Sequence, residues 1–199
     1  MTLSELLTEV YGITKRPDLV TTTTSAIKNA IVKMHTKDFY SKDIVETGVA
    51  FASSLTLQTL AYKTLFPLWR AVSYIQPLSS TSPFDPVGLQ LDQINPQFGI
   101  DDYWVFKDNV YYEAGLNLKI RTNPAAQYFN IGYYAFPNIG STADYFTWIT
   151  QDFPYSVVFD AAAMIFKSIG FAEQEASMRT LVGEQMKLID ISNIQATGY

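Results

Sequence analysis

A stretch between residues 129 and 189 constrains the fold most, because its apolar side chains follow the spacing of α-helices. In its middle part, apolar residues recur every three or four positions and form one stripe. This stripe consists of Val158, Ala161, Ala162, Ile165, Phe166 and Ile169. Pro154 suits the first turn, where a missing N–H costs nothing, and Asp152 before it could cap the helix. The sequence therefore predicts a helix that ends at Gly170, since glycine readily adopts the left-handed conformation.

A second helix is predicted directly after Gly170. Its apolar side is formed by Met178, Val182, Met186 and Ile189. Because the connection is so short, the two helices must lie antiparallel. Asp160 is unusual among the apolar residues of the first helix. It either faces water or pairs with a cation such as Arg179 on the second helix, and the spacing leaves both open.

Two more helices are predicted near the N-terminus. Apolar residues at helical spacing predict a short amphipathic helix over residues 3–11. Thr2 and Glu5 form a capping box for this helix, and Gly12 supplies its end. After a turn, a second apolar stripe predicts a longer helix over residues 19–34.

From Lys42 the hydrophobic period changes to the alternation typical of β-strands. Strands are predicted at residues 45–51, 68–76, 103–106, 110–113, 116–121 and 127–136. Residues 53–66 fit either a strand or a helical turn. Residues 76–99 are rich in proline and serine, which is the composition of a loop. A loop of this length is either a contact loop or an ordinary surface loop.

Strands between two helical ends indicate an α+β protein with an antiparallel sheet. We expect the helices of residues 1–41 and the helical hairpin of residues 137–190 to form a helical bundle. The β-rich region of residues 42–136 is then an insertion into this bundle. Residues 191–199 lack a packed pattern.

The composition argues against several functional classes. The formal charge is −5, whereas a DNA-binding surface needs clustered Lys and Arg. Lys28, Lys33 and Lys37 lie along one predicted helix, so we assign them to its solvated face. The absence of cysteine excludes disulfides and thiolate metal sites. The first residues do not resemble a secretory signal, and no apolar run reaches the ~18 residues of a membrane span, so we expect a soluble cytoplasmic product.

No catalytic motif is present, and no cofactor or metal site is suggested. His35 is the only histidine, and a single histidine on a helix is most often exposed or half-buried without a catalytic role. Asp101 and Asp102 precede an aromatic strand, where they either cap a loop or serve a glycan-cleaving cleft. The aromatic residues that would line such a cleft are Tyr103, Trp104 and Tyr111.

Tyrosine is abundant, with 13 residues, and either provides surfaces that another protein covers or lies at sheet edges. Arg70, Arg121 and Arg179 can bond bidentately, so each is either an interface or core-bridging residue or a plain surface charge.

The order of segments from YYAFP through a Trp-Ile pair and FPYSVVFDAAAMIFKSIG to a Glu/Gln/Ala-rich helix resembles the head-to-tail adaptor proteins of tailed bacteriophages. The N-terminal order of short helix, RPDL, long helix and aromatic strand fits the same pattern. The resemblance implies a virion protein at the head–tail junction, assembled in the host cytoplasm. Residues 53–100 do not match the family pattern, which leaves the loop that contacts the tail open.

Such proteins, as the resemblance implies, form a ring of twelve subunits that binds the portal, extends the DNA channel and docks a tail or nozzle protein. DNA would pass through the lumen without specific binding, and no membrane is involved. The candidate interface residues are Arg70, Trp104, Tyr111, Tyr112, Trp148 and Tyr199.

Residues 191–199 are expected to form an extended arm that docks on the portal or an adjacent subunit, or else a frayed terminus. Two alternative functions stay open. One is a carbohydrate-binding or glycan-degrading module that uses an aromatic surface, Trp104 above all. The other is a small enzyme with acid–base chemistry at Asp101 or Asp102.

Overall fold

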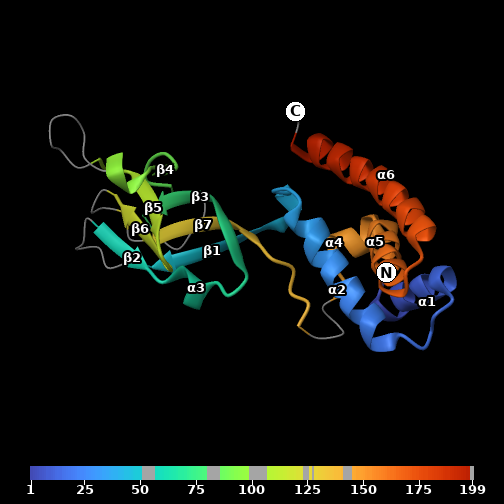
Figure 1. Cartoon of the computed structure of the whole chain (residues 1–199). Coiled ribbons are helices and arrows are strands. Elements are labelled where there is room, and N and C mark those ends of the chain that lie inside the picture. The colour runs from blue at the N-terminus through green and yellow to red at the C-terminus, as the bar shows by residue number, and fades with distance from the viewer. Residues whose placement is uncertain are drawn as a thin grey trace. The chain divides into compact units, whose positions relative to one another are not determined.

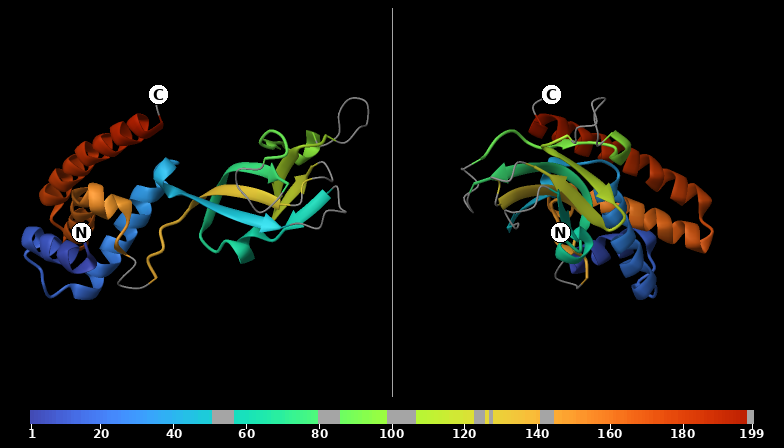
Figure 2. Two further views of the ribbon diagram at one scale, coloured as in Figure 1. Left: turned by 180° about the vertical axis from the view of Figure 1, so that it is seen from behind. Right: turned by 90° about the vertical axis from the view of Figure 1, so that its left-hand side faces the viewer.

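The computed structural model describes residues 1–50, 57–79, 86–98, 107–122, 126, 128–140 and 145–197. The protein is mixed α+β, with about 51% helix and 25% strand (Figure 1). The chain divides into two compact units, Met1–Asp43 with Phe136–Tyr199, and Ile44–Ala135. The first unit holds the long helices, and we call it the helical unit. The second holds the strands and the short helix α3, and we call it the β-rich unit (Figure 2).

The helices of the first unit are α1 (Leu3–Thr14), α2 (Val20–Thr36), the 3₁₀ turn η1 (Ser41–Asp43), α4 (Trp148–Asp152), α5 (Pro154–Ile169) and α6 (Ala172–Thr197). Of these, α1, α2 and α5 lie close to predicted positions, whereas η1 and α4 were not predicted and α6 runs past the predicted end at residue 190. The capping box of Thr2 and Glu5 is confirmed. The predicted end at Gly12 is wrong. Lys15 ends α1 in the left-handed conformation, and its N–H bonds to the Tyr11 carbonyl at 2.9 Å.

The predicted helical hairpin is confirmed as α5 and α6. Pro154 occupies the first turn of α5, and Gly170 ends it with φ 82°. The predicted cap is wrong, because Phe153 occupies the cap position and Asp152 instead pairs with Lys42 at 2.7 Å. Asp160 and Arg179, at similar distances from Gly170 along their helices, are joined by an ion pair, as antiparallel helices require.

The expected extended arm at residues 191–199 is wrong for residues 191–197, which continue α6. This part of the chain contains no glycine or proline before Gly198 that would stop the helix. Asn193 also ties it to η1, because its Oδ1 accepts from the Ser41 N–H at 3.4 Å. Residues 198 and 199 lie outside the described residues.

One hydrophobic core joins these helices. Its buried members come mainly from α1, α2, α4, α5 and α6. They include Leu6, Ile27, Ile31, Met34, Ile149, Val158, Ile165 and Ile189. The periodicity of the sequence predicts most of this set, because each helix contributes one apolar stripe.

The second unit contains two sheets. One has the order β1 (Ile44–Ala50), β7 (Tyr128–Ala135), β3 (Trp69–Leu78), and all its pairs are antiparallel. The other has the order β2 (Leu57–Leu60), β6 (Asn117–Arg121), β5 (Val110–Ala114), β4 (Asp92–Gln93). The pair of β4 and β5 is parallel, which departs from the expected antiparallel sheet.

The ambiguous segment before Pro67 forms both expected structures, β2 and the short helix α3 (Tyr62–Leu65). Within the proline-rich stretch, the described residues form the end of β3, β4 and the 3₁₀ turn η2 (Pro96–Phe98). The predicted strand at residues 103–106 lies outside the described residues. The core of the unit draws on both sheets, and Trp69 stacks on Tyr133 with ring centroids 4.9 Å apart.

Tyr74 of β3 lies across Gly132 of β7. The Tyr74 hydroxyl donates a hydrogen bond to the Glu46 carboxylate on β1, and Asn130 Nδ2 lies 3.4 Å from the same hydroxyl. A Cβ atom on residue 132 would lie 2.3 Å from the ring, so only glycine fits there without displacing Tyr74. This contact joins the three strands on one face of the sheet.

Candidate functional site

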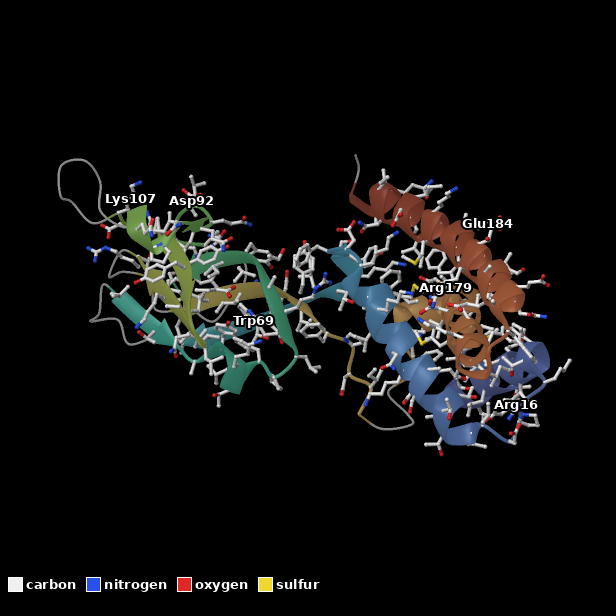
Figure 3. The ribbon with its side chains drawn as sticks, in the orientation of Figure 1. Arg16, Trp69, Asp92, Lys107, Arg179 and Glu184 are labelled. Carbon is white, nitrogen blue, oxygen red and sulfur yellow. The ribbon has the colours of Figure 1, made fainter. Side chains whose placement is uncertain are left out.

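Two buried carboxylates organise the polar contacts of the helical unit. The first is Asp160 on α5, whose exposed fraction is 0%. Its Oδ1 lies 2.6 Å from Lys33 Nζ on α2 and 2.9 Å from Nη1 of Arg179 on α6. Figure 3 labels Arg179. The structure therefore answers the question that the sequence left open, since Asp160 pairs with Arg179 and with a second cation. This buried carboxylate ties three helices together through its two cations. Its contacts suit a structural role and not a catalytic one.

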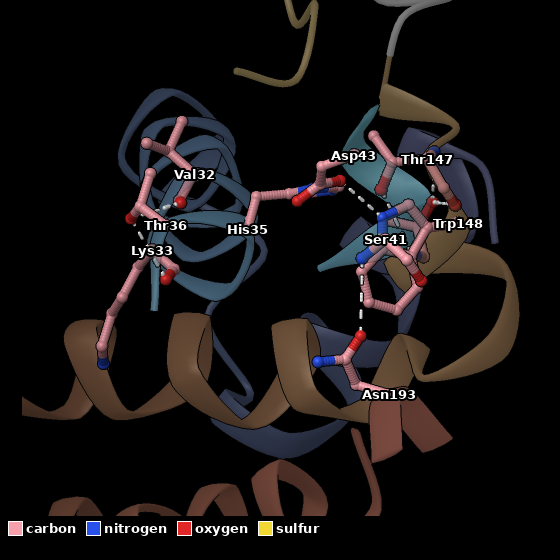
Figure 4. Close-up of polar contacts among 10 residues, drawn as sticks. Val32, Lys33, His35, Thr36, Ser41, Asp43, Thr147, Trp148 and Asn193 are labelled. Carbon is pink, nitrogen blue, oxygen red and sulfur yellow. Dashed lines mark hydrogen bonds and ion pairs between the residues drawn. The ribbon is translucent and has the colours of Figure 1, made fainter. Parts of the chain in front are cut away.

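The second buried carboxylate is Asp43, the last residue of the helical unit before β1. Trp148 Nε1 donates to its Oδ1 at 2.7 Å, and His35 Nδ1 lies 2.7 Å from the same oxygen (Figure 4). A carboxylate only accepts, so His35 donates from Nδ1. We call these three residues the Asp43 cluster.

Aromatic contacts enclose the Asp43 cluster. The Trp148 ring meets His35 edge-on with centroids 5.5 Å apart, and it meets Tyr40 at 5.3 Å. Lys42 Nζ lies 5.1 Å from the Trp148 ring centroid, at a distance suited to a cation–π contact. The cluster thus joins α2, η1 and α4.

The expectation that His35 is exposed or half-buried is wrong, since its exposed fraction is 3%. The imidazole can be buried here because Asp43, eight positions further along the chain, accepts the hydrogen bond of its Nδ1. Burial also separates His35 from any substrate in solution. The cluster is suited to anchoring the chain where it leaves the helical unit.

The structure separates the predicted interface residues into three groups. The prediction that Tyr111 is an interface residue is not supported, because Tyr111 is 5% exposed and packs in the core of the β-rich unit. Arg70 and Tyr112 are half-buried on β3 and β5. Trp148 is half-buried, and its indole N–H is used inside the helical unit. Trp104 and Tyr199 lie outside the described residues.

The other candidate side chains are also placed only in part. Arg121 pairs with Asp108 at 2.9 Å near the surface, while Arg179 bridges to the core. The predicted acid–base pair Asp101 and Asp102, and Tyr103 beside it, lie outside the described residues. Among the residues that are described, no three acidic or histidine side chains gather closely enough to hold a metal ion.

Sequence reasoning missed an exposed apolar feature at the end of the helical unit. On the last turns of α6, a row of apolar side chains is about half exposed, with fractions of 49% for Leu188 and 52% for both Ile191 and Ile194. We call these three residues the α6 row. Apolar residues therefore lie on two sides of α6 here. Ile189 is buried in the core, whereas the three residues of the α6 row are exposed. That pattern was the available signal for a second contact surface.

No helix in the described part of the chain combines the length and the apolar character needed to cross a membrane. The sequence matches no protein-family model, and no curated protein matches it.

Proposed function

We propose that the protein is a head-to-tail adaptor of a tailed bacteriophage, one subunit of a twelve-membered ring at the head–tail junction of the virion. The ring binds the portal, extends the DNA channel and gives a tail or nozzle protein its docking surface. In this proposal the helical unit is a bundle that forms the body of each ring segment, and the β-rich unit is an insertion into it.

The α6 row is the observation that carries the proposal. Apolar side chains at positions 188, 191 and 194 follow one side of a helix and are about half exposed. Contiguous apolar surface on a rigid element is typical of a protein–protein contact. The helix is held in place by Ile189, which is fully buried in the core of the unit, and Lys37 pairs with Asp190 beside it at 2.9 Å. The row is therefore presented on a firmly anchored scaffold, as an assembly protein requires.

The charge of the chain supports a DNA channel rather than a DNA-binding role. A net charge of −5 per chain gives about −60 for twelve copies, which repels phosphates from a lumen. The basic side chains of α2 are partly neutralised within the chain, Lys33 by Asp160 and Lys37 by Asp190. A genome passing through such a ring would slide without sticking.

The direct experiment mixes the purified protein with the isolated portal encoded in the same genome and images the product by electron microscopy. We expect twelve-fold rings bound to one end of the portal. Portals that stay bare at a large excess of the protein would contradict the proposal. A monomeric protein in the absence of portal would not, because the portal can act as the template for the ring.

The glycan-binding alternative is less well supported. Tyr111, one of the aromatic residues expected to line its surface, is buried, and no described contact favours a sugar site. A change in tryptophan fluorescence on addition of oligosaccharides would revive it.

A further inference from the structure

The first strand of the β-rich unit, β1, lies at one edge of its three-stranded sheet. Its seven residues pair with β7 on one side, and within the described part of the chain no strand pairs with its other side. Such an edge presents a row of backbone N–H and C=O groups that can pair with another chain. The residues at positions 45, 46, 48 and 50 are exposed, so the edge is accessible.

The other edge strands of the β-rich unit are protected. At the opposite edge of the same sheet, the register of β3 with β7 shifts at two places, and Val87 and Leu91 cover its second half through backbone hydrogen bonds of 2.9 Å. In the second sheet, β4 has only two residues and β2 only four. Bulges, covering segments and short length are common means of protecting an edge. By contrast, β1 keeps a regular register over all seven residues and contains neither lysine nor proline.

The side chains of β1 leave an apolar contact incomplete. Val45, Thr47 and Val49 share one face, because side chains alternate along a strand. Val49 packs against the core of the β-rich unit, whereas Val45 is 42% exposed. An exposed apolar side chain on an open backbone edge suits a partner strand that supplies hydrogen bonds and apolar cover together.

The sequence of β1 is complementary to a second, antiparallel copy of itself. When Thr47 lies opposite Thr47 of the second copy, all seven residues pair, and each Val45 lies opposite a Val49 that covers it. Glu46 then lies opposite Gly48, so no two carboxylates are directly opposite. The Glu46 carboxylate also accepts a hydrogen bond from Tyr74 within its own sheet, which directs it away from the open edge.

The neighbouring registers are less favourable. A pairing centred on Glu46 sets two carboxylates directly opposite each other, which is destabilising, and it shortens the paired segment to residues 44–48. A pairing centred on Gly48 shortens the paired segment to residues 46–50 and leaves Val45 without an opposite residue. The pairing centred on Thr47 is therefore the one that the side chains of β1 favour.

We propose that β1 pairs with β1 of a second copy, antiparallel and centred on Thr47, so that two three-stranded sheets become one sheet of six strands. Sheets of this size are common in globular proteins. The contact is isologous, because both copies use the same surface, and it closes at two copies. It therefore differs from a contact between neighbours in a ring. The inference goes beyond the proposed function and describes the protein before it binds a portal.

The absence of cysteine makes a direct cross-linking test possible. Thr47→Cys places two thiols opposite each other, where the Cα atoms of an antiparallel pair are about 4.5–5.5 Å apart and suit a disulfide. We expect a disulfide-linked dimer on non-reducing gels after mild oxidation. The matched control is Ala50→Cys, which is exposed on the same strand. In the proposed register its two thiols lie about 20 Å apart, so this variant should not be linked.

Val45→Lys tests the contact without cysteine. A lysine on an edge strand opposes pairing, so the dissociation constant of the dimer in analytical ultracentrifugation should rise about ten-fold. Val45→Thr should keep most of the dimer, and circular dichroism checks the fold of both variants. Hydrogen exchange tests the unaltered protein, because the amides of β1 should gain protection as the protein concentration rises.

The proposal is overturned if β1 gains no protection with concentration, if Thr47→Cys and Ala50→Cys are linked equally, or if Val45→Lys leaves the dissociation constant unchanged. None of these measurements uses a portal, so their outcome is separate from that of the adaptor function. Dimers together with portals that stay bare would keep this contact and remove the adaptor function. Rings on the portal with a free protein that stays monomeric would do the reverse.

Discussion

Asp160 on α5 and Arg179 on α6 face each other across the helical hairpin, with Arg179 Nη1 2.9 Å from Asp160 Oδ1. Lys33 reaches the same oxygen from α2 at 2.6 Å. The carboxylate is fully buried while both cations keep about 40–50% of their side chains exposed. The desolvation of Asp160 is therefore offset by cations that stay partly hydrated, and three helices are fixed at one point.

Removing both cations should destabilise the helical unit strongly. The double variant Lys33→Met with Arg179→Met leaves Asp160 buried without a counter-ion, so we expect a loss of about 3–5 kcal/mol in the free energy of unfolding. Urea denaturation followed by far-UV circular dichroism measures it. Adding Asp160→Asn should recover part of the loss, because the buried charge is then gone.

Arg121→Met provides the control for that variant. Its partner Asp108 is largely exposed, so the loss should stay below about 1 kcal/mol. Equal losses for the Lys33/Arg179 double variant and for Arg121→Met would contradict a stabilising role of the two cations around buried Asp160.

The Asp43 cluster yields a second prediction. Trp148→Phe keeps an aromatic ring but removes the N–H that donates to Asp43. A buried acceptor that loses a donor should lower the free energy of unfolding by about 1–3 kcal/mol. His35→Phe should act in the same direction, because it removes the other donor to the same oxygen. If Trp148→Phe is as stable as the parent protein, the hydrogen bond does not anchor this end of the helical unit.

The close approach of Tyr74 to Gly132 yields a third prediction. Gly132→Ala places a methyl group 2.3 Å from the ring, and we expect a loss of about 1–3 kcal/mol in thermal or urea denaturation. Gly48→Ala on β1 is the matched control, since a Cβ there meets nothing within 4 Å. Combining Gly132→Ala with Tyr74→Ala should abolish most of the additional loss. A Gly132 variant as stable as the Gly48 variant would contradict the steric argument.

Tyr74 also predicts how stability depends on alkaline pH. Burial and the hydrogen bond to Glu46 raise the pKa of Tyr74 from 10.0 to about 12. The folded state holds the Tyr74 proton more tightly than the unfolded state does. The resulting contribution of Tyr74 to the free energy of unfolding is fully present below pH 10 and is lost as the pH rises toward 12. Denaturation curves at several pH values should show a steeper alkaline decline for the parent protein than for Tyr74→Phe. Parallel curves would refute this assignment.

The α6 row predicts a separation of binding from folding. Ile191→Asp places a charge at the centre of the row, where a contact residue of this kind contributes about 2 kcal/mol, so portal binding should weaken roughly thirty-fold. The unfolding free energy should hardly change, since Ile191 is half exposed. Glu184→Lys, on an exposed part of the same helix, is the control. Such point variants are sharper than a deletion of residues 190–199, which would also remove the anchors Asp190 and Asn193.

The sequence by itself determined the local structure of this protein. Pro154, Gly170 and the apolar stripe between them specify α5 and its end, because these effects act within a few residues. Alternating residues likewise indicated β1, β6 and β7. Local patterns could not show which tyrosines form an exposed aromatic surface. Tyr111 and Tyr112 are neighbours on β5, and only the packing of the β-rich unit buries Tyr111 and leaves Tyr112 half-buried.

The tertiary structure alone decided which polar groups meet. Asp160 and Lys33 are 127 positions apart, and Asp43 and Trp148 are 105 apart. The parallel pair of β4 and β5 and the exposure of the α6 row likewise depend on neighbours distant in sequence. Periodicity reports the side on which a residue lies, but the partner on that side is fixed only when the helices and sheets pack and each buried charge must find a counter-charge.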